Sequence, residues 1–63
     1  SMRYLVTYTN EGKQEAFYTE WFDIENNFNP EVGMIVFDLV KHKYLINSLG
    51  WIDIHQDHSY LLK

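Results

Sequence analysis

The residues best suited to chemistry lie near the C-terminus, where Asp53, His55, Asp57 and His58 fall within six positions. On an extended strand Asp53, His55 and Asp57 project from one face at a two-residue spacing. Carboxylate and imidazole groups in that arrangement could hold a zinc or manganese ion. No other His or Cys set has metal-ligand spacing, and His58 points away from the rest. We therefore expect a solvated strand face and no cofactor, with metal binding through Asp53, His55 and Asp57 as an alternative.

General acid–base catalysis is the second chemistry that these residue types support. His42, His55 and His58 titrate near neutral pH, and Asp38 interrupts an apolar run in which burial could raise its pKa. A chain of 63 residues, however, leaves little room for a pocket with supporting groups around it. Asp38 is more simply explained as a carboxylate at a strand edge, bonded to backbone or to the turn at 41–43. We expect no enzymatic activity and no catalytic residues.

Aromatic side chains, which make up 17% of the chain, are the most informative part of its composition. Trp, Tyr and Phe dominate the hot spots of protein interfaces. Phe17, Phe37 and Tyr44 suffice as the aromatic part of a small core, so the other large rings exceed what the core needs. We expect these surplus rings and the apolar C-terminal residues to contact a partner or a second copy: Tyr18, Trp21, Phe22, Phe28, Trp51, Tyr60, Leu61 and Leu62.

The chain is acidic, with nine Asp and Glu residues against five Lys and Arg and a formal net charge of −4. Direct nucleic-acid binding is not expected, because it requires many basic side chains. A nucleotide ligand is disfavoured as well, since Arg3 is the single arginine and the lysines are dispersed along the sequence. The carboxylates could instead imitate phosphates and occupy the nucleic-acid groove of a host DNA-binding protein, which is a further alternative. This acidic face would contain Glu20, Asp23, Glu25, Asp53 and Asp57.

The N-terminal third of the chain predicts a β-hairpin. Residues 3–9 and 14–22 are rich in strand-favouring side chains, and the segment 10–12 between them predicts a three-residue loop ending in glycine. This loop places Leu5 opposite Phe17. Neither face of the hairpin is cleanly polar, so we expect both faces to need cover.

The segment 23–32 predicts an irregular connection with one helical turn. Asp23 is suited to cap that turn, and Pro30 forbids its continuation. Ile24 and Phe28 are the residues expected to hold the connection against the sheet.

An almost unbroken apolar run over 33–40 predicts a strand buried on both faces. Only Asp38 interrupts the run. A chain of this length has no second layer for both faces, so the strand indicates a partner subunit. The alternation places Ile35, Phe37 and Leu39 on one face and Met34, Val36 and Val40 on the other.

The C-terminal third predicts two more strands, over 43–46 and 51–56, and an apolar tail over 57–63 that docks on its own domain or on a partner. The expected fold class is mainly β, small α+β at most: a four- to five-stranded antiparallel meander. Residues 1–63 form a single small domain, and Ser1 is interpreted as a residue left by tag removal.

Size and cysteine content favour a homodimer. A chain this short buries only roughly 60% of the surface that its unfolded form exposes, so small domains usually add disulfides, a metal or a second subunit. This chain has no cysteine, which is also compatible with a reducing cytoplasm. No stretch approaches the roughly 20 apolar residues of a membrane span, and no signal-peptide pattern is present. We therefore expect a cytoplasmic protein that does not bind membranes.

Three segments of the C-terminal half form a recognisable pattern: Val36-Phe37-Asp38-Leu39, Lys43-Tyr44 and the run from Trp51 to His58. They resemble the pattern V-[YF]-D-L, a turn, K-Y, a turn, then W-x-x-I-x-x-D-H of short acidic proteins from Bacillus-type phages. The chain departs from that pattern at 47–50, where a shorter Asp-Gly turn is usual, and in the Tyr-Leu-Leu extension that follows.

Small phage proteins of this size and charge resemble inhibitors of bacterial immunity, including very short dimeric proteins directed against the Hachiman defence system. The resemblance implies a phage-encoded, non-enzymatic protein that binds and blocks a bacterial anti-phage defence protein in the host cytoplasm. It offers no catalytic residues to transfer to this chain.

Overall fold

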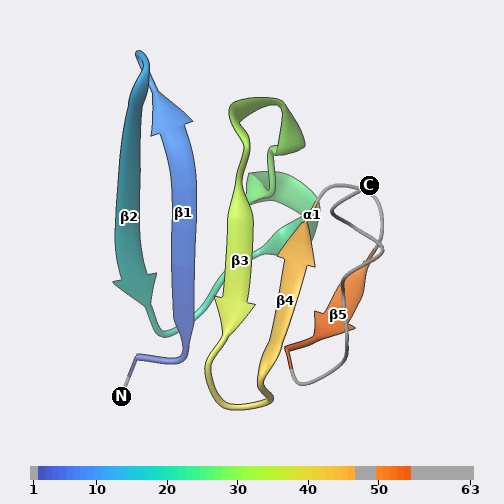
Figure 1. Ribbon diagram of the computed structural model, residues 1–63. Coiled ribbons are helices and arrows are strands. Elements are labelled where there is room, and N and C mark those ends of the chain that lie inside the picture. The colour runs from blue at the N-terminus through green and yellow to red at the C-terminus, as the bar shows by residue number, and fades with distance from the viewer. Residues whose placement is uncertain (1, 47–49, 55–63) are drawn as a thin grey trace.

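Strand-favouring segments form one open antiparallel β-sheet, with little helix (Figure 1). The computed structural model describes residues 2–46 and 50–54. The strands lie in the order β2-β1-β3-β4-β5, and the prediction of a mainly β protein with up to five antiparallel strands is confirmed. Their bounds are β1 (Tyr4–Asn10), β2 (Lys13–Thr19), β3 (Ile35–Asp38), β4 (Lys43–Ile46) and β5 (Trp51–Asp53).

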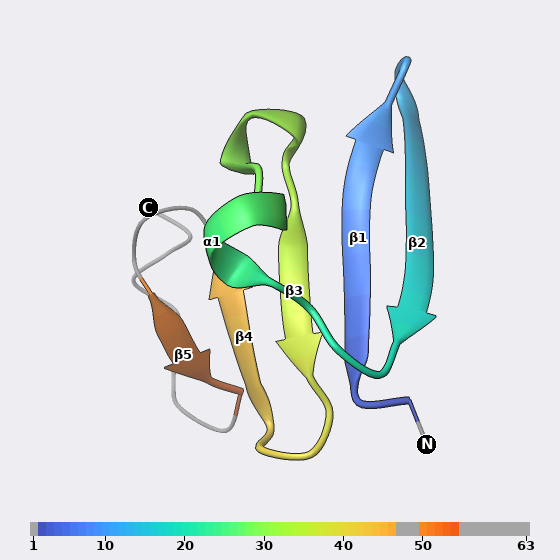
Figure 2. The same cartoon turned by 180° about the vertical axis from the view of Figure 1, so that it is seen from behind.

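The strand order is not that of a simple meander, because β3 pairs with β1 and not with β2. The connection over 20–34 leaves the outer strand β2 and crosses one face of the sheet, so that the chain re-enters on the other side of β1 (Figure 2). Apolar side chains of this connection, Phe22, Ile24 and Phe28, pack against the core. The predicted meander is wrong at this step, because burial of those three residues requires the connection to cross the sheet.

The hairpin of β1 and β2 forms as predicted, but its loop is one residue shorter. Asn10 pairs with Lys13, which leaves only Glu11 and Gly12 in the loop. Both loop residues have positive φ, 51° and 78°. Positive φ at both positions is typical of the type I′ turn, whose twist matches that of the flanking strands.

The shorter loop changes which side chains of the hairpin lie opposite each other. Val6 lies opposite Phe17 and Leu5 opposite Tyr18, so the predicted pair Leu5 and Phe17 is wrong. The assignment of Phe17 to the core is wrong as well. Its side chain is 44% exposed, because β2 is an outer strand, and its ring packs edge-on against Tyr8 at 6.2 Å.

The helical turn in the connection is confirmed at the predicted position. Helix α1 (Ile24–Asn27) begins after Asp23, whose carboxylate Oδ1 accepts the backbone N–H of Asn26 at 3.3 Å. The predicted anchors Ile24 and Phe28 pack against the core cluster. A short 3-10 turn, η1 (Pro30–Val32), then leads into β3. Within the described ranges, no helix has the length and apolar character needed to cross a membrane.

Strand β3 is shorter than the apolar run that predicted it. It ends at Asp38, and Leu39 and Val40 lie in the following turn, where Val40 is 64% exposed. The Asp38 carboxylate Oδ1 accepts the backbone N–H groups of Val40 and Lys41, both at 3.1 Å. The predicted extension of the strand to Val40 is wrong, because this local side-chain bonding competes with continued pairing.

The two C-terminal strands begin at the predicted residues. Strand β4 has the predicted bounds, and β5 pairs with it so that Tyr44 lies opposite Ile52. Strand β5 ends at Asp53 and Ile54 lies in a turn, so the predicted continuation of the strand is wrong at Ile54. The rest of the predicted strand, 55–56, and the tail over 57–63 lie outside the described residues.

The sheet has two different faces. On the covered face, crossed by α1 and its connection, Val6, Val36 and Leu45 lie in one row across β1, β3 and β4 and form the core cluster (Figure 2). Ile35 and Phe37 alternate with Val36 and therefore lie on the opposite surface, here called the open face. The predicted separation of these β3 residues between two faces is confirmed.

Candidate binding surfaces

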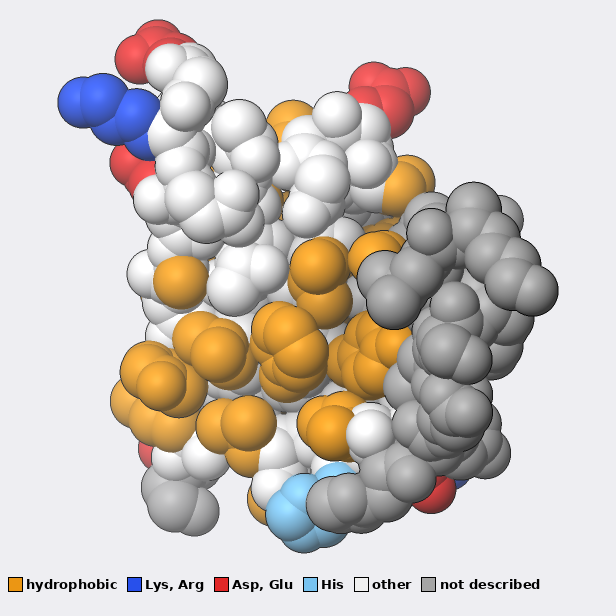
Figure 3. Space-filling view, in the orientation of Figure 1, with side chains coloured by type: hydrophobic (Ala, Val, Ile, Leu, Met, Phe, Trp, Pro, Cys, Tyr) orange, Lys and Arg blue, Asp and Glu red, His pale blue; other side chains and the backbone are white. Residues whose placement is uncertain are grey.

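The open face presents a band of predominantly apolar side chains. Backbone pairing aligns one row across all five strands and a second row across β2, β1, β3 and β4. Neither row contains a charged side chain, and Figure 3 shows hydrophobic side chains gathered over these strands. The first row is Tyr18, Leu5, Phe37, Tyr44 and Ile52, and the second is Ala16, Thr7, Ile35 and Ile46.

On the open face, two aromatic rings pack against each other at the centre, and the side chain on β2 is exposed. The rings of Phe37 and Tyr44 pack against each other with centroids 6.1 Å apart. Ile52 is buried, whereas Tyr18 is 60% exposed at the other end of the same row. An apolar surface with an exposed aromatic ring at its edge has the composition of a protein interface.

The predicted interface residues that the structure describes lie on different surfaces. Tyr18 belongs to the open face, and Trp21, which follows β2, is 71% exposed. Phe22 and Phe28 are partly buried against the core cluster and therefore contribute to the core itself. Trp51 is partly exposed and shares the row of Leu45 on the covered face. Tyr60, Leu61 and Leu62 lie outside the described residues.

The predicted acidic residues come from separate elements. Glu20 and Glu25 are exposed, near the end of β2 and on α1. The carboxylate of Asp23 caps α1, and Asp53 lies opposite Lys43 at the end of β5. Asp57 lies outside the described residues.

A metal-ligand cluster is absent from residues 2–46 and 50–54, in which no three His, Asp or Glu side chains could hold an ion together. Of the three ligands proposed from the sequence, the structure describes Asp53 alone. His55 and Asp57 fall in the part that is not described, so this alternative stays a prediction.

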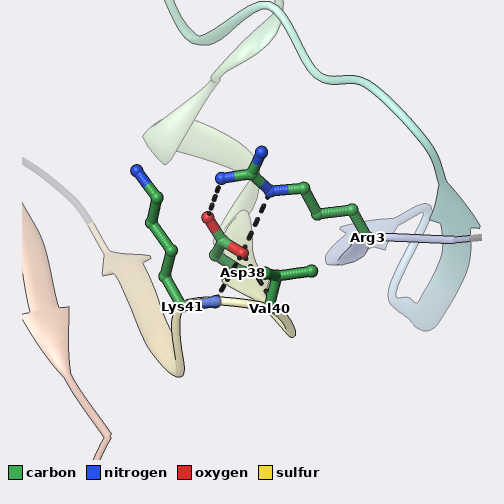
Figure 4. Close-up of polar contacts among 4 residues, drawn as sticks. All are labelled: Arg3, Asp38, Val40 and Lys41. Atoms are coloured by element: carbon green, nitrogen blue, oxygen red, sulfur yellow. Dashed lines mark hydrogen bonds and ion pairs between the residues drawn. The ribbon is translucent and has the colours of Figure 1, made fainter.

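Asp38 is held at the end of β3 by a side chain from the other end of the sequence. Arg3 donates to it through Nε at 3.2 Å and through Nη2 at 2.9 Å (Figure 4). The same carboxylate accepts the backbone N–H groups of Val40 and Lys41, as predicted. The side chain of Asp38 is 6% exposed and that of Arg3 is 36% exposed.

The charge of Asp38 is stabilised by this arrangement. The hydrogen bond from Arg3 lowers the pKa of the Asp38 carboxyl below its usual value and outweighs desolvation, while the bonds from Lys41 and Val40 act in the same direction as Arg3. Burial alone would raise this pKa, which was the condition for an acid–base role of Asp38, but the hydrogen bonds lower it instead. Sequence reasoning missed Arg3 because 35 positions separate the pair and no local pattern links them.

A pocket of about 280 Å³ lies beside the Arg3–Asp38 pair on the covered face. It is formed where the row of Tyr4, Asp38 and Lys43 crosses three strands and where Ile24 of α1 lies over the sheet. Trp51 of β5 and Lys41 of the turn complete the lining. Three of the five basic residues of the chain, dispersed in the sequence, therefore line one pocket: Arg3, Lys41 and Lys43.

No family model matches this chain, and neither a curated protein nor a solved structure matches it. The fold and these two surfaces, the open face and the pocket, are therefore the observations on which function is argued.

Proposed function

We propose that this chain is a non-enzymatic, homodimeric inhibitor that binds and blocks a bacterial anti-phage defence protein in the host cytoplasm. The observation that carries the proposal is the charge-free apolar band on the open face of the sheet. A band of contiguous apolar residues is a typical contact surface, whereas single exposed apolar residues are not. The occupant that we assign to it is a second copy of the chain.

Electrostatics favours a second copy on this face over the rest of the surface. With a net charge of −4, two copies repel each other wherever acidic surfaces approach. The two rows of the open face carry no charged side chain, so a twofold contact there brings no like charges together. A twofold contact is also the commonest symmetry among homo-oligomers.

Contact with the host protein is assigned to a different part of the surface. Trp21 is the most exposed large hydrophobic side chain of the described residues and follows the exposed Glu20. A largely exposed tryptophan suits a partner that has an apolar pocket. The resemblance to short phage inhibitors supports a defence protein as that partner, with Hachiman components as the first to be tested.

Light scattering tests the dimer. The wild-type chain should have twice the monomer mass, and Tyr18→Glu should dissociate it because each copy then brings a carboxylate into the apolar contact. Val40→Glu is the matched control, since it adds the same charge at an exposed apolar residue in the turn after β3. A monomeric wild-type chain, or equal dissociation by both variants, would refute the assigned contact.

Binding to purified Hachiman proteins, and co-purification from hosts with and without single defence systems, test the partner. Wild-type chain should retain one stoichiometric defence protein, and Trp21→Ala should lose it while keeping the fold and the dimer. Val40→Ala, which shortens another exposed apolar side chain, should retain it. Failure to bind any component across several defence systems would refute the proposal.

A further inference from the structure

The pocket on the covered face has features that the proposed inhibitor function does not use. Its lining joins elements that are far apart in the chain: the residues around the start of β1, the first residue of α1, the turn after β3, and strands β4 and β5. Backbone pairing places Tyr4, Asp38 and Lys43 in one row, so the sheet forms one wall of the pocket.

The pocket is cationic within an acidic chain. Its lining contains Arg3, Lys41 and Lys43 against the single carboxylate of Asp38. Asp53 lies opposite Lys43 and supplies a second negative charge nearby. The local net charge is therefore +1, although the whole chain carries −4. Neither lysine forms an ion pair with another side chain of the described residues.

The Arg3 guanidinium is held in position before any ligand arrives. Asp38 fixes the Arg3 guanidinium through two nitrogens, and Tyr4 lies under the same guanidinium at 5.1 Å. The same carboxylate accepts the backbone N–H of Lys41 and so fixes the turn from which that side chain extends. Figure 4 shows Lys41 and Arg3 on either side of the Asp38 carboxylate. Positioned cations favour binding, because less side-chain freedom is lost when a ligand arrives.

Trp51 and Tyr4 add aromatic surface to these charges. Lys and Arg groups bind phosphate through charge-assisted hydrogen bonds, and aromatic rings stack on planar bases. A volume of about 280 Å³ is at the small end of ligand pockets, which suits one ring system with one phosphate. We infer that this pocket binds a small aromatic phosphate monoester, of the class of a nucleoside monophosphate.

Fluorescence titration of the full chain with adenosine 5′-monophosphate tests the inference. The chain has two tryptophans, so the exposed Trp21 is replaced in a Trp21→Phe background that leaves Trp51 as the reporter. Saturable quenching is expected at or below about 1 mM, the range of typical metabolite affinities. Adenosine, which has the ring without the charge, and inorganic phosphate, which has the charge without the ring, should each bind at least about 10-fold more weakly.

Charge variants identify the pocket as the binding site. Lys41→Gln combined with Lys43→Gln should weaken binding by at least about 10-fold, because charge-assisted hydrogen bonds are lost. Lys13→Gln removes one lysine charge from the far end of the hairpin and should leave the affinity unchanged, with circular dichroism confirming the fold of each variant. The inference is overturned by no saturation with the monophosphate, by equal affinity for inorganic phosphate, or by equal weakening in Lys13→Gln. None of these results bears on dimer formation or on capture of a defence protein.

Discussion

Arg3 and Asp38 form a two-pronged ion pair, with Nε and Nη2 at 3.2 and 2.9 Å from the carboxylate, although 35 positions separate them in the sequence. The carboxylate also accepts the backbone N–H groups that begin the turn after β3. The Asp38 side chain therefore ends strand β3, stabilises the turn that follows and connects both to Arg3, the residue before β1. It also positions the Arg3 guanidinium beside the pocket.

Stability should decrease in acid because the pKa of Asp38 is lowered in the folded state. The unfolded chain takes up a proton near the ordinary carboxyl pKa of about 3.9, whereas the folded chain does so only at lower pH. This contribution is therefore complete above about pH 5 and is lost as the pH falls through 3.9 and then through the folded-state value. Urea unfolding across this range measures it.

Asp38→Asn separates the contribution of the ion pair to stability from that of the hydrogen bonds in the turn. Asparagine keeps an oxygen for the turn N–H groups but loses the charge, so we expect a loss of about 1–3 kcal/mol in the free energy of unfolding near neutral pH. The difference from wild type should shrink in acid, where the wild-type carboxylate is protonated as well. A difference that stays constant from neutral to acidic pH would contradict the role given to the ion pair.

Glu11→Asn should stabilise the hairpin. Glu11 has φ 51°, and asparagine followed by glycine is the favoured pair for a loop in which both residues have positive φ. We expect a gain of about 0.5–1 kcal/mol, part of the left-handed backbone cost, read as a higher thermal midpoint. Gly12→Ala should do the reverse through backbone strain alone, because an added Cβ would meet no atom within 4 Å. Equal midpoints for all three chains would disprove the loop geometry.

Truncation should destabilise the chain at Val36 but not at Val40, although both residues belong to one apolar run. Val36 is fully buried in the core cluster, so Val36→Ala should cost about 2–3 kcal/mol from lost burial and the cavity left behind. Val40→Ala should change stability by less than about 0.5 kcal/mol, because that side chain is exposed. Chemical denaturation of the two variants measures both changes. A large loss of stability in Val40→Ala would contradict the end of β3 at Asp38.

Trp21 and Phe22 are adjacent aromatic residues with different expected roles. Phe22→Ala should destabilise the chain by about 1–3 kcal/mol, because the ring is partly buried against the core. Trp21→Ala should leave the free energy of unfolding within about 0.5 kcal/mol of wild type, since the ring is largely exposed. A large loss of stability in Trp21→Ala would place that ring in the core and remove it from the proposed partner contact.

Local signals in the sequence predicted local structure well. The cap at Asp23 predicted α1, and the turn at Lys41 and His42 predicted the start of the short strand β4. The hairpin loop was predicted one residue too long, because the type of residue at Glu11 gives no sign of a positive φ. The end of β3 was missed because Leu39 and Val40 have the composition of a strand, whereas the Asp38 side chain turns the backbone there.

The pocket could not be predicted, because its residues meet only through pairing between distant strands. Arg3 is the single arginine, and its distance in sequence from Lys41 and Lys43 suggested dispersed charge. The place of β3 beside β1 brings these cations together, and that pairing depends on burial of the connection. Burial of apolar side chains in the connection over 20–34 therefore goes together with the grouping of cationic residues around the pocket.

The position of β1 between β2 and β3 also has a consequence for synthesis on the ribosome. The β1–β2 hairpin is complete once Thr19 has emerged, and its contacts are local, so it can form early. Asp38, the partner of Arg3, emerges later by about one to four seconds at usual elongation rates. Throughout that interval the nascent hairpin presents one unpaired edge of β1, and this is the stage at which a chaperone or a second nascent chain would meet it.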